Sequence, residues 1–110
     1  MTVKELSQEL HFETFASEAS LEKQITTCFV SDLLSFVMGY GKPNSVWVTV
    51  QAHMNVIAVA VLKEFSVVII SSDVKLDKDF IDKALAENIP LMKTSLTSYE
   101  VCKKLVNLGI

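Results

Sequence analysis

The sequence SVWVTVQAHMNVIAVAVLKEFSVVIISSD, residues 45–73, carries the strongest indication of how the chain folds. It is apolar over most of its length, yet Gln51, His53 and Asn55 interrupt it near the middle. The β-branched and aromatic residues before the interruption are typical of a strand. The apolar run SVVIISS at the end is typical of a strand buried on both faces. The segment between these two strands determines the topology of the chain.

Residues 54–65 are the ambiguous part, because MNVIAVAVLKEF has the composition of a strand and the length of a helix. Strands usually have about 3 to 10 residues. A hairpin around the QAH segment would also lack the Gly or Asn-Gly that tight turns need. We therefore predict a helix that is buried on most sides. The three polar residues then form either the turn into this helix or a ligand site.

Helix-capping residues outside this stretch indicate where other helices begin. Thr2 and Glu5 have the spacing of a capping box, and Thr97 and Glu100 repeat it near the end of the sequence. Asp77 precedes an amphipathic segment and is predicted to be a further N-cap. Each cap predicts a helix that begins immediately after it.

Ser31 is the remaining predicted N-cap, and Asp32 would place a negative charge in the first turn of the same helix. Gly39 and Gly41 stop this helix, which is predicted over residues 31–38. The strands are predicted at residues 11–16, 24–29, 46–50, 66–72 and 89–93.

Helices and strands alternate along most of the chain, which is the pattern of an α/β fold. The prediction is a single domain over residues 1–110, with a mostly parallel five-stranded sheet and helices on both faces. Half of the residues are hydrophobic, which is enough for a core at this length.

Charge and composition exclude several classes of protein. The net charge is −3 and the 10 basic residues are scattered, so no basic patch for nucleic acid is expected. The longest apolar run, residues 56–62, is far shorter than the roughly 20 residues of a membrane span. The first residues lack the apolar core of a signal peptide. We therefore expect a soluble, cytoplasmic protein with no nucleic-acid or membrane partner.

The two cysteines, Cys28 and Cys102, match neither a disulfide framework nor the spacing of metal ligands. Free cysteines are among the most buried residues, so both are expected to fill space in the core. They are expected to stay reduced, as in a cytoplasmic protein. No metal site and no cofactor is predicted.

A ligand site at one edge of the predicted sheet is a hypothesis that the sequence raises. Ligands of open α/β sheets bind at the carboxyl ends of the strands, where Gln51, His53 and Asn55 would lie. Ser31 and Thr94 follow two other strands and are expected nearby. Amides at the start of the helix would face an anion such as a phosphate. Because turns and caps use the same residue types, architecture is the alternative explanation.

No catalytic residue is assigned. His53 has no cysteine, second histidine or carboxylate at ligand spacing, and no Ser–His–Asp arrangement can be defended from the sequence. The segment GYGK at residues 39–42 lacks the frame of a phosphate-binding loop and follows a helix. The chain is therefore not expected to be an enzyme.

Four segments form a combination that points to a family: VSDLLS at 30–35, VWVTVQAHMNVIAVAVLKE at 46–64, VVIISS at 67–72 and IPLMKTSLTSYE at 89–100. Together they resemble a DRTGG domain. That domain is similar to the amino-terminal domain of HPr kinase/phosphorylase, and it also occurs between nucleotide-sensing modules in some pyrophosphatases. The chain departs from the family where Thr27 and Cys28 replace Gly-Gly, and the acidic–basic pair is present only as Glu22–Lys23.

The resemblance implies a non-catalytic regulatory or assembly domain. The leading hypothesis is a regulatory domain that self-associates and senses a nucleotide-like metabolite at the carboxyl ends of its strands. The alternative is a pure interaction subunit that docks on a larger metabolic enzyme and binds no small ligand. A homodimer is expected on separate grounds. Apolar residues cover most of the circumference of the predicted helix in VSDLLSFVMGY, residues 30–40, so one side can meet a second copy.

Overall fold

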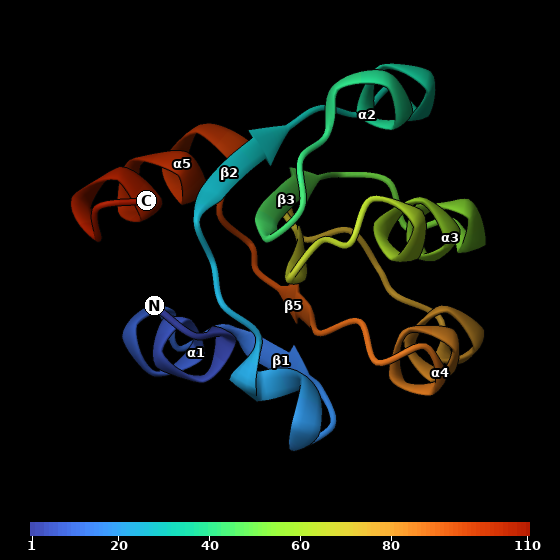
Figure 1. The fold of residues 1–110 in the computed structure, drawn as a ribbon, viewed down its shortest axis with the longest axis horizontal. Helices are drawn as coiled ribbons and strands as arrows, with labels where there is room; N and C mark the ends of the chain where they lie inside the picture. Colours follow the sequence, from blue (N-terminus) through green and yellow to red (C-terminus); the bar gives the residue numbers. More distant parts are fainter.

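The computed structural model of the protein describes all 110 residues and contains one sheet with helices on either side (Figure 1). The predicted order of helices and strands is confirmed. In chain order the elements are α1 (Val3–Leu10), β1 (Glu13–Phe15), a 3₁₀ turn (Ala19–Glu22), β2 (Thr27–Val30), α2 (Leu34–Tyr40), β3 (Ser45–Thr49), α3 (Met54–Leu62), β4 (Val67–Ile70), α4 (Lys78–Ala86), β5 (Leu91–Lys93) and α5 (Ser98–Asn107).

The sheet is mixed. Its strand order is β1-β5-β4-β3-β2, and every pair is parallel except β1 with β5. Parallel neighbours need a crossover connection, and α2, α3 and α4 supply one between each of the strands from β2 to β5. No such helix joins β1 to β5, because the chain leaves β1 through the 3₁₀ turn and runs to the opposite edge. The expectation of a mostly parallel sheet is therefore corrected to a mixed sheet with an antiparallel edge strand.

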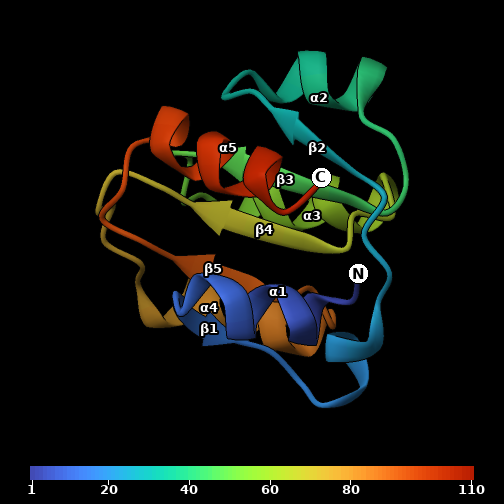
Figure 2. The same ribbon diagram turned by 90° about the vertical axis from the view of Figure 1, so that its left-hand side faces the viewer.

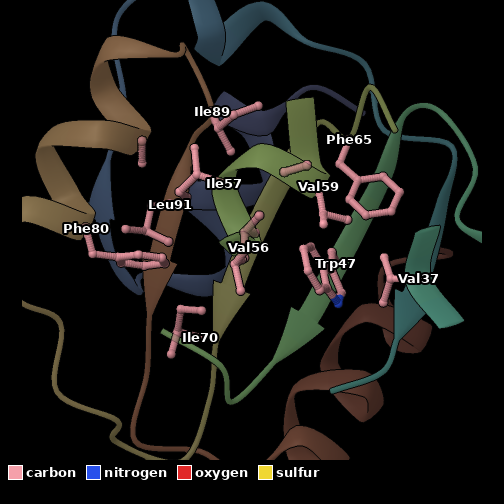
Figure 3. Packing of buried hydrophobic residues seen from close by; sticks show 13 residues of the cluster. Val37, Trp47, Val56, Ile57, Val59, Phe65, Ile70, Phe80, Ile89 and Leu91 are labelled. Carbon is pink, nitrogen blue, oxygen red and sulfur yellow. The ribbon is translucent and has the colours of Figure 1, made fainter. Parts of the chain in front are cut away.

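Two layers of helices enclose the sheet. α2, α3 and α4 cover one face, over a cluster that includes Trp47, Phe65 and Phe80 (Figure 3). α1 and α5 cover the opposite face, where Leu6 and Leu105 belong to a second cluster. Figure 2 shows these two helices lying in front of the strands. Each face of the sheet is therefore shielded from water by its own core.

Residues 54–65 are helical over most of their length, as α3, and the prediction of a helix is confirmed. Val56, Ile57 and Ala60 on this helix are fully buried, and every residue of the following strand β4 is buried as well. A strand at this position would have paired with β3, where β4 lies instead. None of the helices is both long enough and apolar enough to cross a membrane.

The predicted caps of α1, α4 and α5 are confirmed. Thr2 and Thr97 each accept a hydrogen bond from the backbone N–H of the glutamate three residues later, and both capping boxes are complete. Asp77 Oδ1 accepts from the Phe80 N–H at 2.8 Å. These capping side chains accept hydrogen bonds from backbone N–H groups that would otherwise lack partners in the first turn of each helix.

The start of α2 differs from the prediction. The helix begins at Leu34, with Leu33 at the N-cap position and no side-chain cap. The Ser31 hydroxyl does not cap the helix; it accepts a hydrogen bond from the Leu33 N–H at 3.2 Å. The helix begins late because the Asp32 side chain bonds to the end of β3. β2 also differs, since it covers Thr27–Val30 rather than residues 24–29.

Gly41 lies where the chain leaves α2 beside the core. A Cβ atom here would lie 2.5 Å from Phe65 Cζ and 2.8 Å from Val37 O, closer than such atoms pack. We predict that Gly41→Ala lowers the free energy of unfolding by about 1–3 kcal/mol, the usual cost of overpacking. Gly39 has nothing within 4 Å of the same position. Gly39→Ala is therefore the matched control, with a gain of about 0.5–1 kcal/mol. Urea unfolding measures both, and equal stabilities would contradict this packing.

Candidate functional site

The carboxyl ends of the parallel strands meet at one edge of the sheet, as their register requires. Ser31 follows β2, Gln51 and His53 follow β3, and Thr94 follows β5. Asn55 lies in the first turn of α3. This edge, called the carboxyl edge below, is where the sequence predicts a ligand site.

Asp32 organises one half of the carboxyl edge, although the sequence assigned it only a place in the first turn of a helix. Its Oδ1 atom accepts hydrogen bonds from Thr49 Oγ1 at 2.7 Å and from the Val50 N–H at 2.9 Å. Gln51 Nε2 donates to the Asp32 backbone carbonyl at 2.9 Å. The segment before α2 is thereby tied to the end of β3.

Ser31 belongs to the same anchored segment. Its backbone carbonyl accepts a hydrogen bond from the indole Nε1 of the fully buried Trp47 at 2.9 Å. A buried indole N–H needs such a partner, so the core itself holds Ser31 at the edge. The structure therefore brings together two of the predicted residues, Ser31 and Gln51, through Asp32.

His53 and Asn55 form the start of α3. His53 is the N-cap residue, and its Nδ1 atom accepts a hydrogen bond from the Asn55 N–H at 3.1 Å. That amide is therefore not available to an anion. The prediction that the polar interruption includes a turn is confirmed, while its role as a ligand site stays a prediction. Both side chains are exposed, as is that of Gln51.

Thr94 lies in a separate part of the carboxyl edge. Its hydroxyl accepts from the Leu96 N–H at 3.2 Å, and its carbonyl accepts from the Asp73 N–H at 3.0 Å. Ser71, at the end of β4, shares a 2.7 Å hydrogen bond with Ser98 at the start of α5. These bonds join the loops after β4 and β5 to each other. None of them connects Thr94 to Ser31, Gln51, His53 or Asn55.

The hollows on the surface lie away from the five predicted residues. One of about 310 Å³ lies at the amino ends of the strands, beside Asn44, Ser66 and Ile89. Lys23 also lines it, and its Nζ donates to the Asn88 carbonyl at 2.5 Å. Partial burial lowers the pKa of Lys23. The other hollows lie along α5, between α1 and α5, and between α3 and α4. The carboxyl edge is thus a polar surface rather than a cavity.

The structure also brings together Cys28 and Cys102, which the sequence placed separately in the core. Both are half-buried rather than fully buried. Cys28 lies in β2 and Cys102 in α5, and Cys102 is close enough to contribute to the raised pKa of the Cys28 thiol. With 73 residues between them, no local pattern could have shown this proximity.

Comparisons with known proteins show the fold. No family model matches the sequence, and no curated protein is similar to it in sequence. The structure is similar to a crystal structure of the CBS and DRTGG domains of the regulatory region of Clostridium perfringens pyrophosphatase, complexed with the activator diadenosine tetraphosphate. The TM-score is 0.75 at 14% sequence identity, over 96% of this chain.

This chain spans about half of that regulatory region, 46% of its length. At such low identity the likeness concerns the fold. The protein therefore has an α/β fold that is also found in the regulatory region of that enzyme.

Asp32 can be tested as the anchor of the carboxyl edge. We predict that Asp32→Ala lowers the free energy of unfolding by about 1–3 kcal/mol, because the buried Thr49 hydroxyl and the Val50 N–H lose their side-chain acceptor. Asp82→Ala is the control, since Asp82 pairs only with Lys78 on the surface and should cost at most about 1 kcal/mol. Chemical denaturation followed by circular dichroism compares the two. Equal losses would show that Asp32 is not an anchor.

Proposed function

We propose that this chain is a non-catalytic regulatory domain of the DRTGG type, which senses a nucleotide-like metabolite and acts with a larger enzyme. The observation that carries the proposal is the likeness of almost the whole chain to a regulatory region crystallised with a nucleotide activator. The four DRTGG-like segments of the sequence support the family, and the further resemblance to the amino-terminal domain of HPr kinase/phosphorylase rests on those segments alone.

The proposed ligand site is the carboxyl edge, with Gln51, His53 and Asn55 at its centre. The amide groups of Gln51 and Asn55 are exposed, and each offers both donors and acceptors to a ligand. Gln51 Oε1 and the Asn55 side chain have no partner within the protein. His53 uses only Nδ1 for capping, which leaves Nε2 for a ligand. Ser31 and Thr94 are the flanks of the proposed site.

These groups suit the edge of a heterocyclic base better than a phosphate. The amide that would have faced an anion is bonded to His53 Nδ1, and the Asp32 carboxylate adds negative charge to the same edge. Paired amide donors and acceptors match the hydrogen-bonding edges of bases, as they do in base readout by Asn and Gln. The proposed ligand is therefore held by its base, with any phosphates directed toward solvent.

The replacement of the family Gly-Gly by Thr27 and Cys28 fits this proposal. Here these two residues lie at the start of β2, away from the carboxyl edge. Glycine is needed where a backbone must approach a ligand closely or adopt a positive φ. A regular strand demands neither, so a site built from Gln51, His53 and Asn55 does not depend on those glycines.

We also propose that the protein self-associates through α2. Leu33, Phe36 and Tyr40 are 63%, 47% and 66% exposed, respectively, and no charged residue occurs from 33 to 41. The Phe36 ring contacts both the Phe29 and the Tyr40 rings. The exposed aromatic side chains of α2 are therefore packed against Phe29, which itself packs on the core. β2, beside α2, is an edge strand. A second copy would meet an uncharged apolar surface identical to its own, which suits a two-fold dimer.

A pure interaction subunit is the second candidate function. The lack of any hollow at the carboxyl edge and the exposed apolar residues of α2 favour it. In that case the same surfaces would contact a larger enzyme, and no small molecule would bind. Ligand binding therefore separates the two functions.

A thermal-shift titration tests ligand sensing. A nucleotide that binds the folded protein, at about 100 times its Kd, adds about 2.7 kcal/mol to stability and raises the Tm. We predict such a rise with at least one mononucleotide or dinucleotide, and its loss in Gln51→Ala/His53→Ala. Gln8→Ala, on the exposed side of α1, is the control that keeps the rise. If no nucleotide shifts the Tm of the wild type, the interaction-subunit function is favoured. A rise that persists in the double variant would place the ligand elsewhere.

Multi-angle light scattering tests self-association. We predict a dimer at high micromolar concentration and a monomer for Leu33→Glu, because the new carboxylates would repel each other across the two-fold axis and lose water. Tyr99→Glu is the control, since Tyr99 on α5 is 78% exposed but lies outside the proposed interface. A wild type that stays monomeric, or a Leu33→Glu variant that stays dimeric, would reject the proposed interface.

A further inference from the structure

The thiols of Cys28 and Cys102 face the same side of the sheet. Cys28 pairs in register with Val46, which belongs to the core between the sheet and α1 and α5. Since alternate strand residues point to opposite faces, the Cys28 side chain points toward α5, and it packs against that core. Cys102 lies on α5 between Val101 and Leu105, which are buried in the same core. The two elements lie side by side in Figure 1.

This arrangement places the two cysteines on the same side of the sheet, with Cys102 close enough to affect the pKa of Cys28, although β2 is an edge strand and α5 lies near the end of the sequence. Both residues are half-buried. The flank of α5 that carries Cys102 is open to solvent one turn further on, where Val106 is 68% exposed. A small oxidant can therefore approach Cys102 along this flank.

We propose that Cys28 and Cys102 form a dithiol site that is oxidised by small-molecule disulfides to an intramolecular disulfide joining β2 to α5. In the first step the Cys102 thiolate attacks the reagent, its S–S bond breaks, and one thiolate leaves while a mixed disulfide forms on Cys102. In the second step Cys28 gives its proton to water and attacks the Cys102 sulfur, which releases the second thiol. Two protein thiols are oxidised, and one disulfide is reduced to two thiols.

Burial controls the speed of this reaction. Burial first, and the neighbouring Cys102 second, raise the pKa of Cys28 to about 12. The thiolate is the attacking species, so Cys28 is poorly suited to start the reaction or to close the ring quickly at neutral pH. Below that pKa the thiolate fraction rises about tenfold per pH unit, and the closing step should accelerate in proportion. Oxidation is therefore slow at pH 7 and faster in alkaline solution.

The experiment incubates the native, reduced protein with oxidised glutathione and follows it by intact mass and tryptic peptide mapping. We expect loss of two hydrogen atoms with no added glutathione, and a linked pair of peptides covering residues 24–63 and 94–103, since trypsin does not cut between Lys42 and Pro43. Cys28→Ser should instead accumulate a mixed disulfide at Cys102. The oxidised wild type should melt at a higher temperature than the reduced one, because the cross-link restricts the unfolded chain.

The pH series and an unfolded control keep the proposal falsifiable even where a variant folds poorly. Wild-type ring closure should speed up by a similar factor with each step from pH 7 to pH 9, whereas the same reaction in guanidinium should level off at about pH 8.5, the usual pKa of an exposed cysteine, since unfolding removes the burial. Stable glutathione adducts on both cysteines, or a disulfide between two chains only, would overturn the proposal. A disulfide that forms only in guanidinium would overturn it as well.

Discussion

The structure depends on two strands, β3 and β4, that are buried on both faces at every position. Burying a large aliphatic side chain contributes about 1.5–3 kcal/mol, so these strands supply much of the hydrophobic stabilisation of a small domain. That stabilisation requires helices on both faces of the sheet. It also requires residues 54–65 to leave the sheet and cover it, because a hairpin with β3 would expose one face. The alternating order of the elements follows from this need.

Because β3 and β4 are buried on both faces, the polar groups of the sheet find their hydrogen-bond partners at the ends of the strands. Thr49 is fully buried at the end of β3, and its hydroxyl needs a partner, which the Asp32 carboxylate provides. The buried indole N–H of Trp47 in β3 also needs a hydrogen-bond partner, and it donates to the Ser31 carbonyl. The core thus fixes the segment between β2 and α2, and with it the position of Gln51. The proposed binding surface is a consequence of how the buried strand satisfies its polar groups.

Local patterns predicted most of the fold. Capping boxes at Thr2 and Thr97 involve partners three residues away, so sequence spacing is sufficient to find them. The order of elements and the helix at 54–65 follow from composition and length. The antiparallel β1 could not be predicted in the same way, because its direction is set by packing beside β5, far along the chain. The late start of α2 has a similar cause.

In the candidate site, too, the local contacts were predictable from the sequence and the contacts between distant residues were not. His53 and Asn55 are neighbours in the sequence, and their turn was predictable, whereas the bonds of Asp32 reach residues 17 and 18 positions away. Thr94 was grouped with the others because all of them follow strands, but its own hydrogen bonds tie it to the loop after β4. The proximity of Cys28 and Cys102 depends on the order of the strands in the sheet. The spacing of residues along the sequence does not reveal that order.

We propose above that a nucleotide-like ligand binds at the carboxyl edge through exposed amides and an imidazole. Nuclear magnetic resonance measures this most directly, by following backbone amide shifts of the ¹⁵N-labelled protein during titration with a nucleotide that raises its Tm. Binding at the carboxyl edge should shift the signals of residues 31–32 and 49–55 and leave the amino ends of the strands unchanged. Shifts concentrated around Lys23, Asn44 and Ser66, where the surface is hollowed at the opposite edge, would contradict it.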